Sequence, residues 1–174
     1  SNLMLQWCND LDAVLREFRR VLKPRGLVTF TTFGPDTLTE LRAAWRAVDG
    51  DVHVNRFLDM HDVGDAMVRA GLAEPVMDLD YFRLTYPRVL DLMRDLKAIG
   101  AHNVAAGRRR GLTGRARLRA VTEAYEQHRH DGRLPATWEV VYGQAWGPLA
   151  RPERPAGDGE ITVALDRIGR RERP

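Results

Sequence analysis

The chain contains 174 residues, 44% of them hydrophobic and 29% charged, which is enough for one folded domain with its own core. The 15 glycines and 9 prolines are too few for a disordered or collagen-like chain. No apolar run reaches the length of a membrane span, and a net charge of +3 is too small to indicate nucleic-acid binding. The single cysteine, Cys8, excludes an internal disulfide. Together with the lack of a basic-then-apolar leader, it favours a cytoplasmic protein.

The N-terminal segment predicts a helix followed by a buried strand. Apolar side chains recur at helical spacing over residues 10–22, and either Asn9 or Asp10 can cap this helix. Residues 27–33 are β-branched, aromatic and apolar enough for a central strand. Ser1–Trp7 has the pattern of a strand end that runs into a loop. A helix between two strands predicts parallel packing.

Two helices are expected next. Thr37 and Glu40 have the spacing of a capping box, in which each side chain bonds the other residue's backbone N–H. Apolar residues follow at helical spacing as far as Val48. Another helix is predicted over residues 59–70, where Gly71 ends it.

The second half of the chain predicts two strands that enclose a helical segment. Residues 76–86 form the first of these strands, and a slip in its alternation near Tyr81-Phe82 indicates a bulge. The helical segment covers about 87–135 and is expected to place Pro87 in its first turn. The remaining residues are expected to form the last strand, 137–146, and a loose tail, 148–174.

The order of these elements predicts an α/β fold whose sheet is parallel with a mixed edge. Three strands are too few for a doubly wound sheet, and the chain has no G-x-G-x-x-G turn of the kind that binds nucleotide cofactors. We therefore expect this chain to be the second half of a longer domain. The first residue, Ser1 instead of Met, agrees with a processed or truncated chain.

Several motifs resemble those of a known superfamily. The turn Leu22-Lys23-Pro24-Arg25-Gly26, followed by the apolar run over 27–33, resembles the class I S-adenosylmethionine (SAM) methyltransferases. The opening Ser-Asn-x-x-x-Gln-Trp at residues 1–7 is similar to a narrower family, the malonyl-acyl-carrier-protein O-methyltransferases of biotin synthesis. Four later stretches, Leu38–Trp45, Leu92–Ala101, Gly107–Thr113 and Val140–Gly143, fit the same family, so that the resemblance covers about residues 1–147.

The resemblance implies a fold and a reaction. The fold would be the C-terminal part of a Rossmann-like class I methyltransferase sheet, with a helical cap inserted before the last strand. The reaction would be SAM-dependent methylation of the free carboxylate of a malonyl thioester, with malonyl-acyl carrier protein or malonyl-CoA as the partner. No catalytic residue is identified, because a carboxylate is already ionised at neutral pH and needs alignment more than a base.

The candidate site residues follow from this placement at a strand end, where ligands bind in open α/β sheets. Asn2 and Leu5 are expected to border the cofactor. The expected acceptor and partner contacts are Gln6, Trp7, Tyr86, Tyr142, Arg108, Arg109 and Arg110. The alternative for the first group is an ordinary strand-to-helix loop with a core tryptophan, and for the arginines a solvated basic loop.

Two other functions stay open at this point. The chain could belong to another small-molecule methyltransferase with the same cap, or be a truncated module that binds a partner without a cofactor. A metal site is not expected, because the spacing of the histidines indicates no ligand set; they are His53, His61, His102, His128 and His130.

Overall fold

The computed structural model describes residues 1–101, 103–105, 108–109 and 111–149, so most of the predicted tail lies outside the described residues. The helices and strands predicted from residue 10 onward are present, but the strand end predicted within Ser1–Trp7 is not: this segment contains a 3-10 helix and no assigned strand. In chain order the elements are the 3-10 helix η1 (Leu5–Trp7), α1 (Leu11–Val21), β1 (Leu27–Phe33), α2 (Thr39–Arg46), α3 (Met60–Arg69), β2 (Ala73–Tyr86), α4 (Val89–Ala98), α5 (Arg115–Glu126) and β3 (Leu134–Trp146). In these ranges, no helix combines the length and apolar character needed to cross a membrane.

The sheet has the order β1-β3-β2, so that the last strand in sequence lies between the other two. β3 pairs antiparallel with both neighbours. On its other edge β1 meets the first residues of the chain: the Thr31 N–H donates to the Ser1 carbonyl at 2.9 Å, and the Leu3 N–H donates to the Thr31 carbonyl at 3.1 Å. Thr31 is thus bonded to both Ser1 and Leu3, which are two positions apart, and this is the bonding pattern of parallel backbone segments. Both strand pairings among the described residues are antiparallel, so the predicted parallel packing of these strands is wrong, and only the bonds of Thr31 to the unassigned segment Ser1–Leu3 have a parallel pattern.

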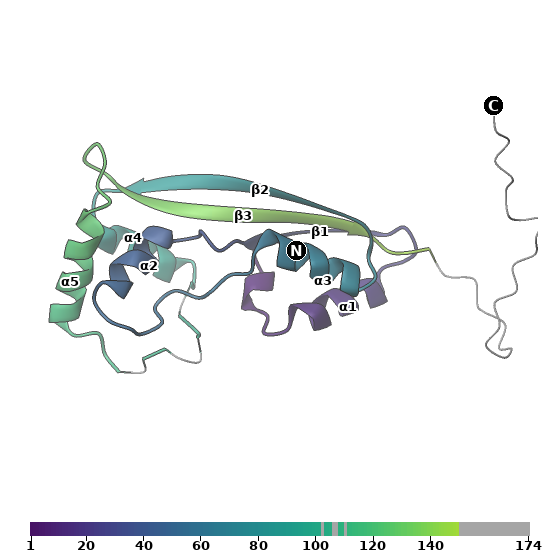
Figure 1. Ribbon diagram of the computed structural model, residues 1–174, viewed down its shortest axis with the longest axis horizontal. Helices are drawn as coiled ribbons and strands as arrows, with labels where there is room; N and C mark the ends of the chain where they lie inside the picture. Colours follow the sequence, from purple (N-terminus) through teal and green to yellow (C-terminus); the bar gives the residue numbers. More distant parts are fainter. Residues whose placement is uncertain (102, 106–107, 110, 150–174) are drawn as a thin grey trace, which may run out of the picture.

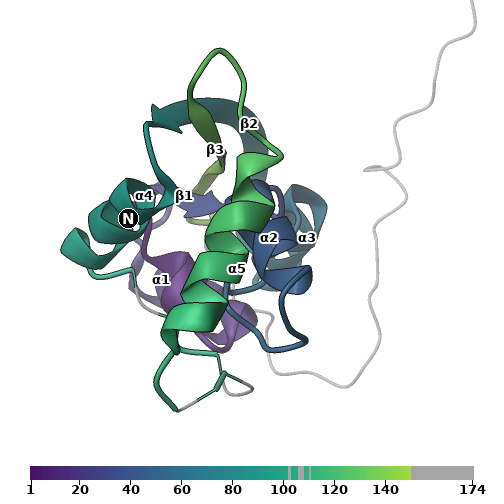
Figure 2. The ribbon, with the colours of Figure 1, turned by 90° about the vertical axis from the view of Figure 1, so that its left-hand side faces the viewer.

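The helices form two groups along the long strands, and Figure 1 shows both groups below the sheet. Seen from the end in Figure 2, α5 stands in front, with α2 and α4 beside it. One buried cluster joins α2, α4 and α5 to Leu134 and Ala136 of β3, and the other joins α1 and α3 to Ala145. Leu134 and Ala136 have even numbers and Ala145 has an odd one. Because successive side chains of a strand alternate, the first two point to one local face of β3 and Ala145 points to the other. The right-handed twist of the ribbon turns each face toward its own helices.

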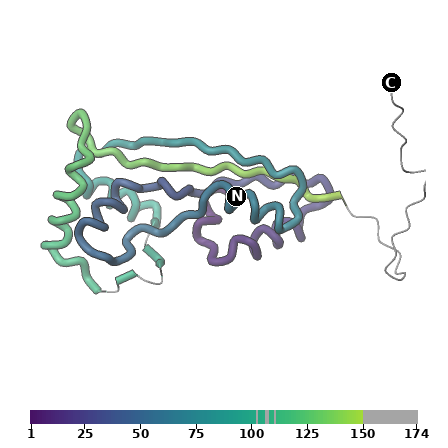
Figure 3. The backbone as a smooth tube through the Cα atoms, viewed as in Figure 1, coloured from purple at the N-terminus to yellow at the C-terminus, as the bar shows by residue number. Residues whose placement is uncertain are grey.

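The segment between α2 and α3 connects the two helix groups. In Figure 3 residues 47–59 run from the group on the left to the group on the right, and residues 55–58 line the same cavity as Thr32 and Phe33 at the end of β1. The segment contains no helix or strand. Its position beside the end of β1 makes it available to line a site there.

The predicted capping box is wrong. The Thr37 hydroxyl donates to the backbone carbonyl of Glu139 at 3.0 Å and accepts from the Glu139 N–H at 3.1 Å. The Glu40 carboxylate accepts from the Thr137 N–H at 3.0 Å instead of reaching back to the helix start. α2 begins after Leu38, which has a positive φ of 56°. Both polar side chains bond β3, because the folded strand offers backbone groups that the isolated segment lacks.

Two predicted backbone details are also corrected. The pairing of β2 with β3 is continuous through Tyr81-Phe82, and its register shift lies between Ala73 and Val76. Glu74 has a positive φ of 50° there, and the following Pro75 has no N–H to give to the ladder. Pro87 precedes the N-cap of α4, which is Arg88, and does not enter the first helical turn.

Candidate functional site

A cavity of about 710 Å³ opens where β1 ends. Its walls come from η1, from Thr32 and Phe33 of β1, from residues 52–58 and from Val104–Ala105. This volume is within the range of ligand pockets, and the carboxyl ends of strands are the usual place for a ligand in an open α/β sheet. The cavity is therefore the candidate ligand site of the described residues.

Gln6 is held firmly in the wall of this cavity. Its side-chain amide donates to the Leu3 carbonyl at 2.6 Å, and its carbonyl oxygen accepts from the Thr32 hydroxyl at 3.3 Å. The neighbouring Trp7 is 44% exposed at the cavity, so that its ring is open to a ligand. Gln6 and Thr32 thus fix η1 against β1, and Trp7 supplies an aromatic surface.

A smaller crevice of about 80 Å³ adjoins the cavity and shares with it Gln6, Trp7, Phe33, Asn55 and Phe57. The Phe33 ring lies edge-on to Phe57, with their centroids 5.7 Å apart, and 5.2 Å from the ring of Trp138 on β3. α4 and the residues after it contribute Leu96, Ala101 and Asn103. Sequence reasoning missed Phe33, Phe57 and Trp138, and only the position of Phe33 at a strand end signalled a site.

The polar groups at the site are few. Arg56 is the one charged side chain among the described residues that line the larger cavity. Asn55 Oδ1 and Trp138 Nε1 are buried and have no hydrogen-bond partner within the described part of the chain. Both residues line the crevice. The site therefore combines aromatic walls, one cation at the outer cavity and two unpaired polar atoms inside.

The structure brings together only some of the predicted site residues. Leu5, Gln6 and Trp7 line the cavity. Asn2 accepts a hydrogen bond from the Thr31 hydroxyl at 2.6 Å and, with Tyr142, lines a separate hollow of about 650 Å³ on the sheet.

The remaining predicted residues lie away from these hollows or at their border. Tyr86 packs against the cluster of α2, α4 and α5, where burial and the neighbouring Asp95 carboxylate raise its pKa. Arg108 and Arg109 are exposed, and the Arg108 N–H donates to the carbonyl of Ala105, a cavity residue, at 3.0 Å. Arg110 lies outside the described residues.

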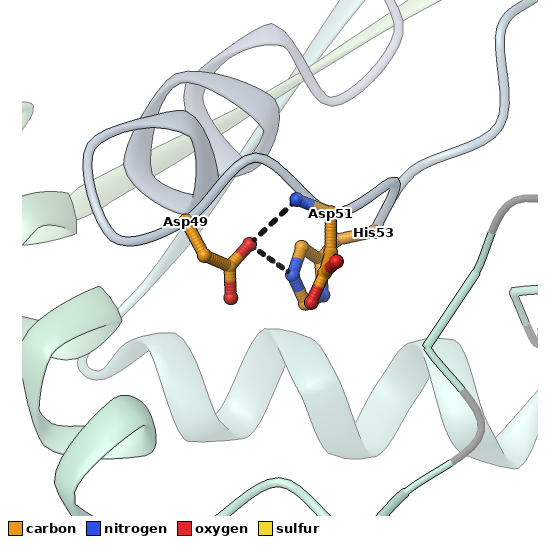
Figure 4. A group of neighbouring side chains, drawn as sticks. All are labelled: Asp49, Asp51 and His53. Carbon is orange, nitrogen blue, oxygen red and sulfur yellow. Dashed lines mark hydrogen bonds and ion pairs between the residues drawn. The ribbon is translucent and has the colours of Figure 1, made fainter.

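The sequence analysis did not anticipate the group Asp49, Asp51 and His53, shown in Figure 4, whose possible ligand atoms lie within 4.8 Å of one another. Asp49 Oδ1 is 2.8 Å from His53 Nε2 and accepts from the Asp51 N–H at 3.0 Å. Burial acts to raise the pKa of Asp49, but these hydrogen bonds and the charges of His53 and Arg117 outweigh it and hold that pKa below its usual value.

Neighbouring side chains account for this group without a metal. Arg117 on α5 places its guanidinium 3.4 Å from Asp49 and 3.5 Å from Asp51. The ring of His53 stacks on Trp45 of α2 with the centroids 3.6 Å apart. The group ties residues 49–53 to α2 and α5, and the absence of a metal ligand set stays a prediction.

Comparison with known proteins first identifies the class. The family described as "Methyltransferase domain" matches residues 1–30. A solved structure from Bacillus halodurans C-125, provisionally named a methyltransferase, superposes with a TM-score of 0.51 at 15% sequence identity, over 84% of this chain and 67% of that chain. At this identity the likeness concerns the fold alone. The fold is that of part of a class I methyltransferase.

The comparison with curated proteins is more specific. The chain is 61% identical over 163 residues to malonyl-[acyl-carrier protein] O-methyltransferase of Laribacter hongkongensis. The matched region covers 94% of this chain and 55% of the relative. It is also 48% identical over 151 residues to the biotin biosynthesis bifunctional protein BioHC of Saccharophagus degradans. This match covers 83% of this chain and 27% of that protein. The chain spans about half the length of the curated malonyl-[acyl-carrier protein] O-methyltransferases it matches. The resemblance found in the sequence is thus confirmed.

Proposed function

We propose that this chain forms the acceptor side of a SAM-dependent methyltransferase. The whole protein would methylate the free carboxylate of a malonyl thioester on acyl carrier protein, an early step of biotin synthesis. The observation that carries this proposal is the 61% identity to a malonyl-[acyl-carrier protein] O-methyltransferase over 94% of the chain. The relatives' names mention the acyl-carrier protein and not malonyl-CoA, so the proposal is confined to the carrier protein.

The residues of the cavity fit the proposed cofactor. SAM, when bound, supplies a methyl group on a positively charged sulfur. Trp7, Phe33 and Phe57 present aromatic rings at the cavity, and the faces of such rings attract cations. Leu5, the first residue of η1, adds an apolar wall. These four residues would hold the part of the cofactor that reaches this half of the protein.

The chain's own contribution to the reaction is alignment and exclusion of water. A carboxylate titrates near pH 4, so the acceptor is ionised at neutral pH and no residue has to remove a proton. Arg56 can hold this carboxylate through charge-assisted hydrogen bonds and so fix its direction. The aromatic walls keep the carboxylate poorly hydrated, which favours a step in which opposite charges combine.

The carrier protein would dock beside the cavity. Arg108 is bonded to Ala105, which lines the cavity, and both Arg108 and Arg109 are exposed. Exposed cations at a rim speed the encounter with an acidic protein. The helices α4 and α5 would act as the cap, because residues at the end of α4 line the crevice.

Methyl transfer to malonyl-acyl carrier protein tests the proposal. The full-length protein is incubated with SAM that carries a deuterated methyl group, and the mass of the intact carrier protein is measured. We expect one added methyl group on malonyl-acyl carrier protein and none on acetyl-acyl carrier protein, which lacks the free carboxylate.

The other outcomes of this experiment distinguish the alternatives. Methylation of small carboxylic acids without methylation of malonyl-acyl carrier protein would make the protein a different small-molecule methyltransferase. If neither class of acceptor is methylated and SAM does not bind, the protein is a non-catalytic module.

A further inference from the structure

The crevice beside Trp138 contains two polar atoms whose partners are missing among the described residues. Trp138 Nε1, a hydrogen-bond donor, and Asn55 Oδ1, an acceptor, are both buried there. Buried polar groups are nearly always hydrogen-bonded, because leaving one without a partner costs free energy. Two such atoms in one crevice point to a group that binds between them.

The walls of the crevice indicate an uncharged group. Among the described lining residues there is no lysine, arginine or acidic side chain, and the one histidine, His53, is bonded to Asp49. The rest of the wall is mostly aromatic and aliphatic; it includes Phe33, Phe57, Leu38, Leu41 and Leu96. A carboxylate would lose its hydration here without gaining a counter-charge, whereas a neutral carbonyl loses little.

The size of the crevice limits the group further. Its volume of about 80 Å³ is far below the volume of about 710 Å³ of the outer cavity, so it accommodates only a small part of a ligand. The adjoining outer cavity contains Arg56, the cation suited to a carboxylate. The two spaces therefore differ in charge as the two ends of a malonyl thioester do.

We propose that the crevice binds the thioester carbonyl of the acceptor, with the Trp138 indole N–H donating a hydrogen bond to the carbonyl oxygen. The proposal rests on the function proposed above. The carboxamide of Asn55 supplies a second hydrogen bond, because a half-turn of its side chain presents the NH₂ group to the same space. The malonyl carboxylate then stays in the outer cavity with Arg56.

Indole resonances test the proposal directly. The full-length protein is labelled with ¹⁵N-tryptophan, and the indole signals of the four tryptophans of this chain are assigned with single Trp→Phe variants. Malonyl-pantetheine and acetyl-pantetheine, which both carry a thioester carbonyl, should shift the Trp138 signal. Malonate, which lacks the thioester, should not shift it. Trp146, on the exposed end of β3, is the internal control and should stay unchanged.

Kinetics provide the second readout. Trp138→Phe keeps the aromatic ring but removes the N–H, and loss of one such hydrogen bond should raise KM for malonyl-acyl carrier protein about three- to tenfold, with kcat largely kept. Trp146→Phe is the matched control. If Trp138→Phe does not fold, Asn55→Ala takes its place in the kinetic experiment.

The outcomes separate this proposal from the function on which it rests. If the unaltered protein fails to methylate malonyl-acyl carrier protein, the proposed function is wrong. The inference is overturned if the protein methylates the carrier protein, neither thioester shifts the Trp138 signal and Trp138→Phe leaves KM unchanged. The crevice would then hold only water.

Discussion

The charged side chains near the end of β1 lie in contrasting environments. Arg56 is exposed beside an aromatic cavity. Glu139 on β3 is only 4% exposed, and its carboxylate accepts from the Asp36 N–H at 2.6 Å. Gly34 is required next to it, because an added Cβ would lie 2.3 Å from the Glu139 carboxyl carbon. Arg56 is thus placed to meet a ligand, whereas Glu139 is enclosed by the turn after β1.

Replacing Arg56 should weaken acceptor binding in the full-length protein. A hydrogen bond to a charged group contributes roughly 1.5–3 kcal/mol, so Arg56→Ala should raise KM for malonyl-acyl carrier protein at least about tenfold. Arg56→Lys should restore part of the loss, because it keeps the charge but not the forked geometry. The control is Arg46→Ala, at an exposed position of α2 outside the cavity. An Arg56→Ala variant with unaltered kinetics would remove Arg56 from the site.

Glu139 should make stability depend on pH. Burial, with the Asp36 and Asp59 carboxylates nearby, raises its pKa above the ordinary value, although the hydrogen bond from the Asp36 backbone opposes this. The native state therefore favours the protonated form. Its stabilising contribution is complete below the ordinary glutamate pKa of about 4.3 and is lost as the pH rises through the raised native pKa.

In the variant Glu139→Gln the free energy of unfolding should fall less as the pH rises, because the glutamine side chain stays neutral. Urea unfolding at a series of pH values from about 4 to about 8 measures the free energy of unfolding of both proteins. We expect the variant to lose less stability than the unaltered chain as the pH rises. Glu123→Gln, at an exposed position of α5, should follow the unaltered profile. Parallel profiles for Glu139→Gln would show that Glu139 is not the group responsible.

At the scale of elements, the start of α1 shows how one cap is chosen from two. The sequence allows Asn9 or Asp10, and the structure uses Asp10, whose carboxylate accepts from the Ala13 N–H at 2.8 Å. Asp10→Ala should lower the free energy of unfolding by about 1 kcal/mol, the usual cost of a lost N-cap. Asn9→Ala should change it by much less. Equal losses in urea unfolding of the two variants would contradict this assignment.

The segment after α4 should govern the encounter with the carrier protein. Changing both Arg108 and Arg109 to Ala in the full-length protein should lower turnover at limiting malonyl-acyl carrier protein and flatten its dependence on salt, because rim charges act mainly on association rate. Saturating substrate should restore much of the rate. The control is the pair Arg16→Ala and Arg20→Ala on α1, because neither arginine lines the cavity. A fall of kcat at saturation would instead place the two arginines in the transition state.

At the scale of the whole molecule, we expect the chain to supply only part of a cofactor site. It spans about half the length of its curated relatives and contains no G-x-G-x-x-G turn. Such a turn allows the close backbone approach that nucleotide cofactors need. We therefore expect the 174-residue chain by itself to bind SAM weakly or not at all. Calorimetric titration of the purified chain measures this, with the full-length protein as the positive control, and micromolar binding by the chain alone would contradict it.

The sequence by itself determined the elements and the resemblance, because both depend on neighbouring residues. Helical spacing located α1, α3 and α5, and a β-branched run located β1. The motif around Gln6-Trp7 also indicated where a site would begin, and both residues line the cavity. Such local signals are read along the chain without knowledge of how distant segments meet.

Only the tertiary structure decided which distant residues meet. Phe33, Phe57 and Trp138 form one aromatic wall because β3 inserts beside β1 and the segment after α2 passes the strand end. Thr37 and Glu40 do not cap α2 but bond backbone groups of β3, which lies about a hundred residues away in the chain. Pairing and packing across such separations depend on the register and twist of the whole sheet, and short-range propensities do not contain that information.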